Sequence, residues 1–148
     1  PMSVNEEVFS YAYKNGVKTI LNPAPANKPT DILLEHTTWF IPNEVEFEEI
    51  YGEVFNEDNL LLFANDLKTN VVVTLGEKGC AYIKNNSVEI MNTDTVKAVD
   101  TTGAGDAFVG AFSFGVASKL EIEECLKLAL QKATDSVTKK GTQSSYKN

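Results

Sequence analysis

Residues 71–91 read VVVTLGEKGCAYIKNNSVEIM, and this stretch decides the fold class. Its first five residues, VVVTL, form the continuously apolar run that is typical of a strand inside a parallel sheet with both faces covered. Two further runs, Cys80–Lys84 and Ser87–Met91, are joined by Asn85-Asn86, a dipeptide that favours a tight hairpin turn. The stretch therefore predicts a mostly parallel sheet with an antiparallel hairpin at its edge.

Helical and extended patterns alternate on both sides of this stretch. Upstream, the pattern predicts a helix that ends at Gly16, strands at 17–21 and 37–41, and helices at 44–51 and 57–68. Downstream, it predicts an extended segment at 95–99 and helices at 108–117 and 122–137. Strands separated by helices in this order imply right-handed crossovers and an α/β layer structure.

Composition excludes several classes of protein. The 148 residues include 21 acidic and 13 basic side chains, a net charge of −8, and every basic side chain is a lysine. Nucleic-acid binding depends on neutralising many phosphates at once, so this balance argues against it. No run approaches the roughly 18–20 apolar residues that a membrane span needs. Without arginine, phosphate has to be held by backbone amides, helix ends, a metal or single lysines.

Cysteine and histidine add few candidates. Cys80 and Cys125 lie in apolar settings without metal-ligand spacing, which indicates small packed side chains in a reducing compartment. His36 is the only histidine, so histidine-rich zinc sites are excluded. A Ser-His-Asp triad would depend on His36 alone, and its position between a helix and a strand disfavours that interpretation.

The segment Asp100-Thr101-Thr102-Gly103-Ala104-Gly105-Asp106 lies between the extended segment and a helix expected to begin near Asp106. Gly103 and Gly105 allow a tight turn and leave no Cβ in front of the amides. Amides that point out of such a turn at a helix N-terminus form an anion site. Asp106 fits two interpretations equally: an acid stabilising the first helical turn by ~0.3–1 kcal/mol, or a base that takes a proton from an attacking hydroxyl.

Asn43 and Glu46 form a second candidate pair. They lie three residues apart at the start of a predicted helix and point to the same side. Spacing alone favours an N-cap with its N3 partner over a ligand-binding pair, although the two roles are compatible.

The stretch DTTGAGDAFVGAF at 100–112 resembles the carboxy-terminal signature of the ribokinase-like (PfkB) carbohydrate kinases. Shorter motifs follow the family's order: NPAPA at 22–26, PNEVE at 42–46, TLG at 74–76 with Gly79, and GTQSS at 141–145. The resemblance covers essentially the whole chain and implies a three-layer ribokinase-like α/β fold with helices on both faces of the sheet. The chain is expected to be the carboxy-terminal, nucleotide-binding and catalytic part of a single kinase domain, without the amino-terminal sugar-binding and lid part.

Site residues follow from this resemblance, position by position. It implies that Asp106 is the catalytic base and that the amides of Gly103, Ala104 and Gly105 form the anion hole. The residues expected at the nucleotide are Asn43, Glu46, Thr74, Leu75, Gly76, Glu77, Lys78, Gly79 and Gly105, with Asn43 and Glu46 orienting Mg²⁺ and phosphate through water. A K⁺ ion is expected at the Asp100 carboxylate, the Ser145 hydroxyl and the carbonyls of Thr102, Ser136, Lys139 and Gly141. Asp100 alone would also suit a local cap of the turn.

The implied activity is transfer of the ATP γ-phosphate to a primary hydroxyl of a sugar, with D-ribose favoured and ribose 5-phosphate as product. Another acceptor, such as fructose, a nucleoside or a ketodeoxy acid, is an alternative within the same class. A nucleotide-binding fragment without activity is the alternative from a different class. The expected setting is cytoplasmic, with ATP, Mg²⁺ and K⁺; a homodimer of the full-length enzyme is left open. Leu130 departs from the family pattern, because it stands near the expected adenine where a small or polar residue is common.

Overall fold

The computed structural model describes residues 2–93, 96 and 99–138. Within these limits the chain forms two compact units. The first is built from residues 2–75 and 81–89, and the second from residues 76–80 and the described residues from 90 onward. Each unit carries part of the predicted site.

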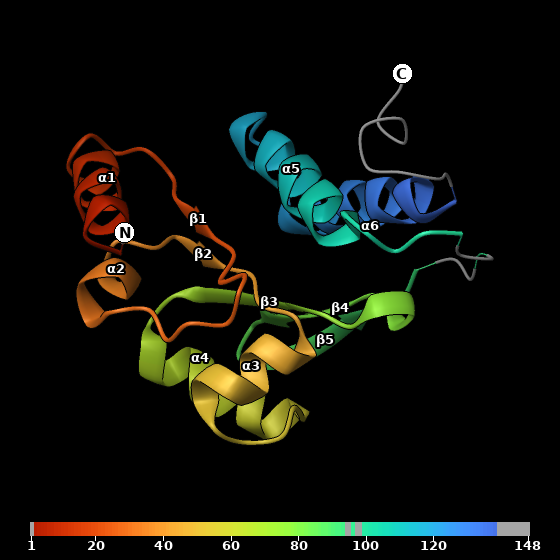
Figure 1. The fold of residues 1–148 in the computed structure, drawn as a ribbon, viewed down its shortest axis with the longest axis horizontal. Coiled ribbons are helices and arrows are strands. Elements are labelled where there is room, and N and C mark those ends of the chain that lie inside the picture. The colour runs from red at the N-terminus through yellow and green to blue at the C-terminus, as the bar shows by residue number, and fades with distance from the viewer. Residues whose placement is uncertain (1, 94–95, 97–98, 139–148) are drawn as a thin grey trace. The chain divides into compact units, whose positions relative to one another are not determined.

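A five-stranded sheet organises the first unit, in the order β1-β2-β3-β4-β5 (Figure 1). The strands are β1 (Ile20–Leu21), β2 (Trp39–Phe40), β3 (Asn70–Thr74), β4 (Cys80–Lys84) and β5 (Ser87–Met91). β1 pairs with β2 and β2 with β3 in parallel. The connection from β3 to β4 is too short for a crossover, and Asn85 and Asn86 take the left-handed conformation of a tight hairpin turn, with φ of 50° and 62°. The predicted parallel sheet with an antiparallel edge hairpin is confirmed.

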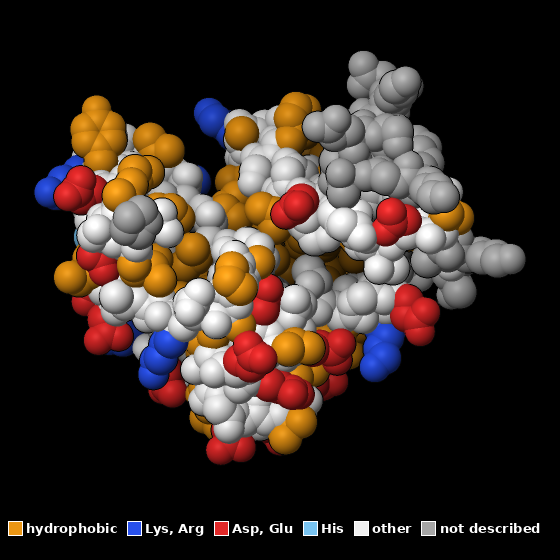
Figure 2. All heavy atoms as spheres, viewed as in Figure 1, with side chains coloured by type: hydrophobic (Ala, Val, Ile, Leu, Met, Phe, Trp, Pro, Cys, Tyr) orange, Lys and Arg blue, Asp and Glu red, His pale blue; other side chains and the backbone are white. Residues whose placement is uncertain are grey.

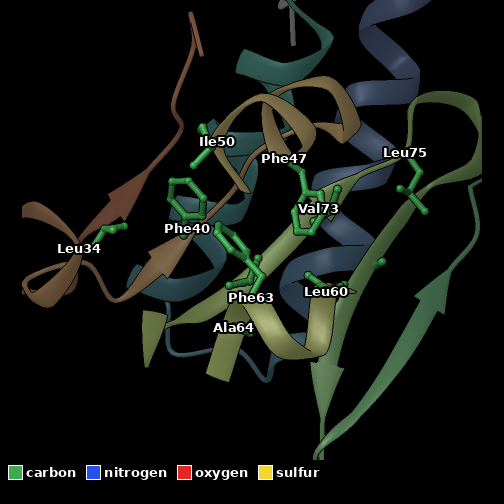
Figure 3. Close-up of a cluster of buried hydrophobic side chains, with 11 residues drawn as sticks. Leu34, Phe40, Phe47, Ile50, Leu60, Phe63, Ala64, Val73 and Leu75 are labelled. Atoms are coloured by element: carbon green, nitrogen blue, oxygen red, sulfur yellow. The ribbon is translucent and has the colours of Figure 1, made fainter. Parts of the chain in front are cut away.

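Helices α3 (Glu44–Tyr51) and α4 (Glu57–Leu67) bury an aromatic core against this sheet. Phe47 of α3 meets Phe63 of α4 edge to face, with ring centroids 5.1 Å apart, and the ring centroid of Phe40 of β2 lies 5.9 Å from that of Phe63 (Figure 3). Phe40 and Phe47 have no exposed surface. Burial of such a side chain contributes about 1.5–3 kcal/mol, so these contacts fix α3 and its first turn to the sheet.

The helices of the second unit are α5 (Ala104–Ala117) and α6 (Ile122–Val137), preceded by the 3₁₀ turn η1 (Gly76–Lys78). The two helices lie so close together at Gly115 that a Cβ added there would be 2.8 Å from the Sγ of Cys125. On the buried side of α5 the rings of Phe108 and Phe112 stack with centroids 6.3 Å apart. This packing holds the N-terminus of α5, where the predicted anion site lies, on a rigid helix pair.

Several elements differ from the sequence predictions. The second strand covers only Trp39–Phe40 rather than 37–41, and most of the extended segment predicted at 95–99 lies outside the described residues. The first strand covers only Ile20–Leu21, because the N–H of Val17 donates to Ala12 O and completes the end of α1 (Met2–Lys14). A short helix, α2 (Asp31–Glu35), was not predicted; Thr30 caps it by accepting the N–H of Leu33. Helix α5 begins at Ala104 rather than near Asp106.

Acidic side chains gather over α3 and α4 (Figure 2). The exposed residues of this surface include Glu48, Glu49, Glu53, Glu57 and Asp58. A surface of one sign repels nucleic-acid phosphate, as the composition suggested. In the described part of the chain, no helix has the length and apolar character required to cross a bilayer.

Candidate functional site

In the first unit, polar residues from three sequence motifs meet at one edge of the sheet. Asn22 follows β1, Asn43 follows β2, and Thr74 ends β3. Because these strands are parallel, their carboxyl ends lie at the same edge, where α/β proteins bind ligands. Asn43 and Thr74 form a parallel bridge, and the Thr74 N–H donates to Pro42 O at 3.0 Å. The structure thus brings the predicted nucleotide residues Asn43 and Thr74 into direct contact.

Asn43 and Glu46 form a complete capping box at the start of α3. The Glu46 N–H donates to Asn43 Oδ1 at 2.8 Å, and the Asn43 N–H donates to Glu46 Oε2 at 2.9 Å. Glu46 is 7% exposed, whereas Asn43 is open to solvent. The predicted N-cap is confirmed, and the role of the pair at a nucleotide stays a prediction.

In the motif TLGEKG, packing alone explains the residue type at two positions. Leu75 is 5% exposed and belongs to the hydrophobic core of the first unit. Gly79 has φ +103°, and a Cβ there would lie 2.0 Å from Met91 O. Between them Gly76 has φ +57°, and Glu77 and Lys78 are exposed on η1. The solvent-facing part of this motif, available to a ligand, is therefore the turn at 76–78.

In the second unit, the glycine turn lies at the start of a helix, where backbone amides can bind an anion, although the Ala104 N–H already donates to Thr101 O at 3.3 Å. Gly103 is left-handed, with φ 82°, and is the N-cap of α5 without any side-chain cap. The first turn is closed by Ala107 N–H donating to Gly103 O at 2.9 Å. A Cβ built at Gly105 would meet no described atom within 4 Å apart from its chain neighbours and the backbone of its own helix, so the space beside its Cα is open. Asp106 lies exposed in the same turn. The structure thus brings the four predicted catalytic residues together.

The turn is anchored to the end of α6. The N–H groups of Val99 and Asp100 both donate to Val137 O, at 2.8 and 3.2 Å. Asp100 Oδ1 accepts the Thr102 N–H at 2.9 Å, which confirms the local cap that aspartate was expected to form. Ser136, buried at 3% exposure, is the neighbour of Val137. The described part of the predicted K⁺ set therefore meets where the turn joins α6.

The remaining predicted K⁺ residues, Lys139, Gly141 and Ser145, lie outside the described residues, as does the GTQSS motif. Within the described ranges, no three His, Cys, Asp or Glu side chains cluster in a way that would hold a metal directly. A cation held mainly by carbonyls, or through water, is the kind of ion that this donor set suits.

A cavity of about 490 Å³ opens along α6 in the same unit. Its lining comes from α6 and from the segment after β5: Met91, Asn92, Thr93, Val96, Lys127, Leu130, Gln131, Thr134 and Asp135. The hydroxyls of Thr93 and Thr134 lie 2.7 Å apart and tie the two walls. Its volume suits a small-molecule site. Of these lining residues, only Leu130 was predicted from the sequence to lie near the nucleotide. The spacing of Lys127, Leu130 and Thr134, three and four residues apart, could have indicated that they share one face of α6.

The cysteines and the histidine have structural roles. Burial raises the pKa of the Cys80 thiol to about 12, and burial also raises the pKa of Cys125, so neither is a reactive thiolate. His36 Nδ1 lies 2.9 Å from Ser10 Oγ, and its ring lies 4.9 Å from that of Tyr13. Among the described residues, no carboxylate contacts this imidazole. His36 therefore ties α1 to the end of α2, and the disfavoured triad finds no support.

Solved structures and sequence relatives agree with this architecture. A structure of Arabidopsis thaliana ribokinase complexed with ribose and ATP matches 98% of this chain and 49% of its own, with TM-score 0.90 and 29% identity. Ribokinase from Thermotoga maritima matches 91% of this chain and 48% of its own, with TM-score 0.80 and 33% identity. The ribokinase-like fold predicted from the sequence is confirmed.

Among sequence relatives, a deoxyribokinase of Salmonella typhi is 38% identical over 144 residues, covering 93% of this chain and 47% of its own. A ribokinase of Haemophilus influenzae is 38% identical over 150 residues, covering 98% and 49%. The chain thus spans about half the length of the curated relatives it matches. Residues 1–148 match the family described as pfkB family carbohydrate kinase. This chain belongs to the pfkB family of carbohydrate kinases.

Proposed function

We propose that this chain is the nucleotide-binding and catalytic part of a single kinase domain that transfers the γ-phosphate of ATP to a primary hydroxyl of a sugar. D-Ribose, giving ribose 5-phosphate, is the favoured acceptor, because similar proteins are named ribokinase and one was solved with ribose and ATP. Deoxyribose is the second candidate, because the Salmonella relative of equal identity is named a deoxyribokinase. Other acceptors of the family would use the same catalytic turn.

The glycine turn at the start of α5 is the observation that carries this proposal. Asp106 lies in the first turn of α5, directly after the amides of Gly103, Ala104 and Gly105. The carboxylate takes the proton from the attacking hydroxyl, while the amides and the positive end of the helix stabilise the charge on the transferred phosphoryl group. Each role needs the other, since loss of one preorganised donor in comparable sites costs ~2.7–4 kcal/mol.

In the first unit, Asn43, Glu46 and Thr74 would contact the phosphates of the nucleotide at the sheet edge. In the second unit, the turn at 76–78 is a further proposed nucleotide contact. The cavity beside Leu130 would hold the base. The lining combines apolar side chains, Met91, Val96 and Leu130, with polar side chains such as Asn92 and Gln131, so both shape and hydrogen bonds would hold the base.

Two cations fit the residues present. A hydrated Mg²⁺ suits a site with one buried carboxylate, Glu46, beside the exposed Asn43, and it would supply charge neutralisation for the phosphates. K⁺ would add positive charge beside the anion hole, held by Asp100, Thr102 and Ser136 together with Lys139, Gly141 and Ser145. The protein itself already stiffens the turn through the bonds of Val99 and Asp100 to Val137 O.

The test replaces Asp106 by Asn. ADP release is measured with ATP, Mg²⁺ and either ribose or deoxyribose, and nucleotide affinity is measured by calorimetry with a non-hydrolysable ATP analogue. In the intact kinase that contains this chain, we expect Asp106→Asn to bind the analogue normally and to lose about 10²–10⁴-fold in turnover, as expected for a general base. Asp58→Asn is the matched control, because Asp58 is also an exposed first-turn acid, on α4. Turnover of Asp106→Asn equal to that of the control would refute the assignment.

The same calorimetry separates the kinase from the alternative of a fragment that only binds nucleotide. Binding of the analogue without binding of ribose would assign these 148 residues to the nucleotide part alone. Measurable sugar-dependent ADP release from the chain would exclude the binding-only alternative.

A further inference from the structure

The Asn22-Pro23 dipeptide interrupts the pairing of β1 with β2 at the predicted ligand edge. In the register of these strands, Ile20 pairs with Trp39 and Leu21 with Phe40, so residue 22 faces Ile41. The Ile41 N–H donates to Leu21 O at 2.8 Å, as a continuing parallel ladder requires. The next bond in that ladder would run from the N–H of residue 23 to Ile41 O. Residue 23 is proline and has no N–H to give.

The side chain of Asn22 supplies the missing donor. Its Nδ2 donates to Ile41 O at 2.7 Å, which replaces the main-chain bond that Pro23 removes. Ile41 has no exposed surface, so without this bond its carbonyl would be a poorly hydrated acceptor. The bond therefore closes the end of the β1–β2 ladder one residue before Pro42.

The β2–α3 turn is consequently held from both sides. On the β3 side, the Thr74 N–H donates to Pro42 O at 3.0 Å. On the β1 side, Asn22 holds Ile41 O. The next residue after this doubly held segment is Asn43, whose capping box with Glu46 begins α3.

We infer that Asn22 is a positioning residue for the Asn43–Glu46 pair. It sets the direction in which the chain leaves β2, and thereby the place of the Asn43 side chain and of the buried Glu46 carboxylate. The expected change in affinity for the magnesium nucleotide rests on the proposed function. The effect of Asn22 on the capping box does not depend on any activity.

The test compares Asn22→Asp with Asn70→Asp in the full chain. Asn70 is a matched control, because its Nδ2 also donates to a main-chain carbonyl of the strand region, Thr38 O at 2.9 Å, but at the amino end of β3. Amide hydrogen exchange is measured by NMR at Asn43 and Glu46, relative to core amides of α4. Affinity for a non-hydrolysable ATP analogue is measured with and without Mg²⁺.

For Asn22→Asp we expect exchange at the two capping-box amides to accelerate about tenfold or more relative to α4, because a nearly buried carbonyl loses its donor. We also expect affinity for the magnesium nucleotide to fall about tenfold, with little change for the nucleotide alone. Asn70→Asp should show neither effect. Should Asn22→Asp not fold, Asn22→Ala, which also removes the donor to Ile41 O but adds no charge, gives the same comparison.

Unchanged exchange at Asn43 and Glu46, or equal acceleration in Asn70→Asp, would overturn the inference. Faster exchange with unchanged magnesium-nucleotide affinity would overturn the consequence inferred at the magnesium nucleotide, since the bond would then position the capping box for the fold alone. If the wild-type chain binds no nucleotide analogue, the proposed function fails, while the exchange data still decide whether Asn22 positions the capping box.

Discussion

Gly79→Ala tests whether the turn after β3 needs glycine for packing. A Cβ at this position would lie 2.0 Å from Met91 O and 2.9 Å from Asn92 Cα. Both atoms belong to the backbone, so rotation of a side chain cannot relieve the overlap. The backbone of Gly79 also has φ +103°, a region that residues with a Cβ rarely adopt.

The loss of stability expected for Gly79→Ala has two parts, the cost of the backbone conformation and the cost of the steric overlap. A neighbouring glycine, Gly76, allows the first part to be measured alone. Gly76 also has a positive φ, +57°, but a Cβ there would meet nothing within 4 Å. Alanine in such a conformation costs about 1–2 kcal/mol, offset by about 0.4–1 kcal/mol from the stiffer unfolded chain. Gly79→Ala adds the displacement of the Met91–Asn92 backbone, for which overpacking of about 1–3 kcal/mol is the guide. We expect a loss of about 1 kcal/mol for Gly76→Ala and about 2–4 kcal/mol for Gly79→Ala.

The assay is urea unfolding of the wild type and both variants, followed by far-ultraviolet circular dichroism. With a slope of about 1–3 kcal/mol per molar urea, Gly79→Ala should unfold at a midpoint about 1 M or more below Gly76→Ala. If the two variants differ by less than about 0.5 kcal/mol, the contact with Met91 O does not constrain the turn, and the packing explanation for Gly79 is wrong.

Three further outcomes follow from the same structure. Gly115→Ala should cost about 1–3 kcal/mol in urea unfolding, because the new Cβ would lie 2.8 Å from Cys125 Sγ, and Cys125→Ala should recover part of that loss in the double variant. The pKa of the Cys80 thiol is about 12 in the folded protein and near 9 in the unfolded chain. Because folding favours the neutral thiol, its contribution to the free energy of unfolding is present below pH 9 and is lost as pH rises toward 12. Between pH 8 and pH 10, the wild type should lose about 1.4 kcal/mol more than Cys80→Ala; equal losses would contradict the burial of the thiol. Gly105→Ala should keep or slightly raise the free energy of unfolding but lower sugar-dependent ADP release, and normal turnover would argue against an anion at this amide.

Local sequence predicted the centre of the sheet well because its signals are strong and short in range. Val71, Val72 and Val73 are at most 1% exposed, which is what a continuous apolar run inside a sheet requires. The Asn85-Asn86 turn needs two left-handed residues, and asparagine tolerates that conformation better than most. These features specify the strand and hairpin without reference to the rest of the chain.

The sequence predictions are wrong where the local structure depends on tertiary contacts or where an element is too short to show a period. α2 (Asp31–Glu35) has too few residues for a helical period to be visible, and only the Thr30 cap marks it. Val17 looks like a strand residue by composition, yet it is 58% exposed because its N–H completes the end of α1. The cavity beside Leu130 likewise depends on how the segment after β5 runs along α6, a contact between residues about forty positions apart, as in the pair Thr93 and Thr134.

The glycines of the motifs predicted to bind phosphate differ in whether the fold itself requires glycine at their position. Gly103 needs its glycine for φ 82°, and Gly79 needs it for the close approach of Met91 O. Gly105 needs it for neither reason: it lies within α5, and a Cβ there would meet no described atom within 4 Å apart from its chain neighbours and the backbone of its own helix. Glycine in a helix costs up to about 1 kcal/mol relative to alanine. In a chain without arginine, backbone amides are one of the means left for holding phosphate, beside helix ends, a metal and single lysines. The open space beside Gly105 would suit such an approach, which is why we propose a ligand-binding role for this glycine and test it with Gly105→Ala.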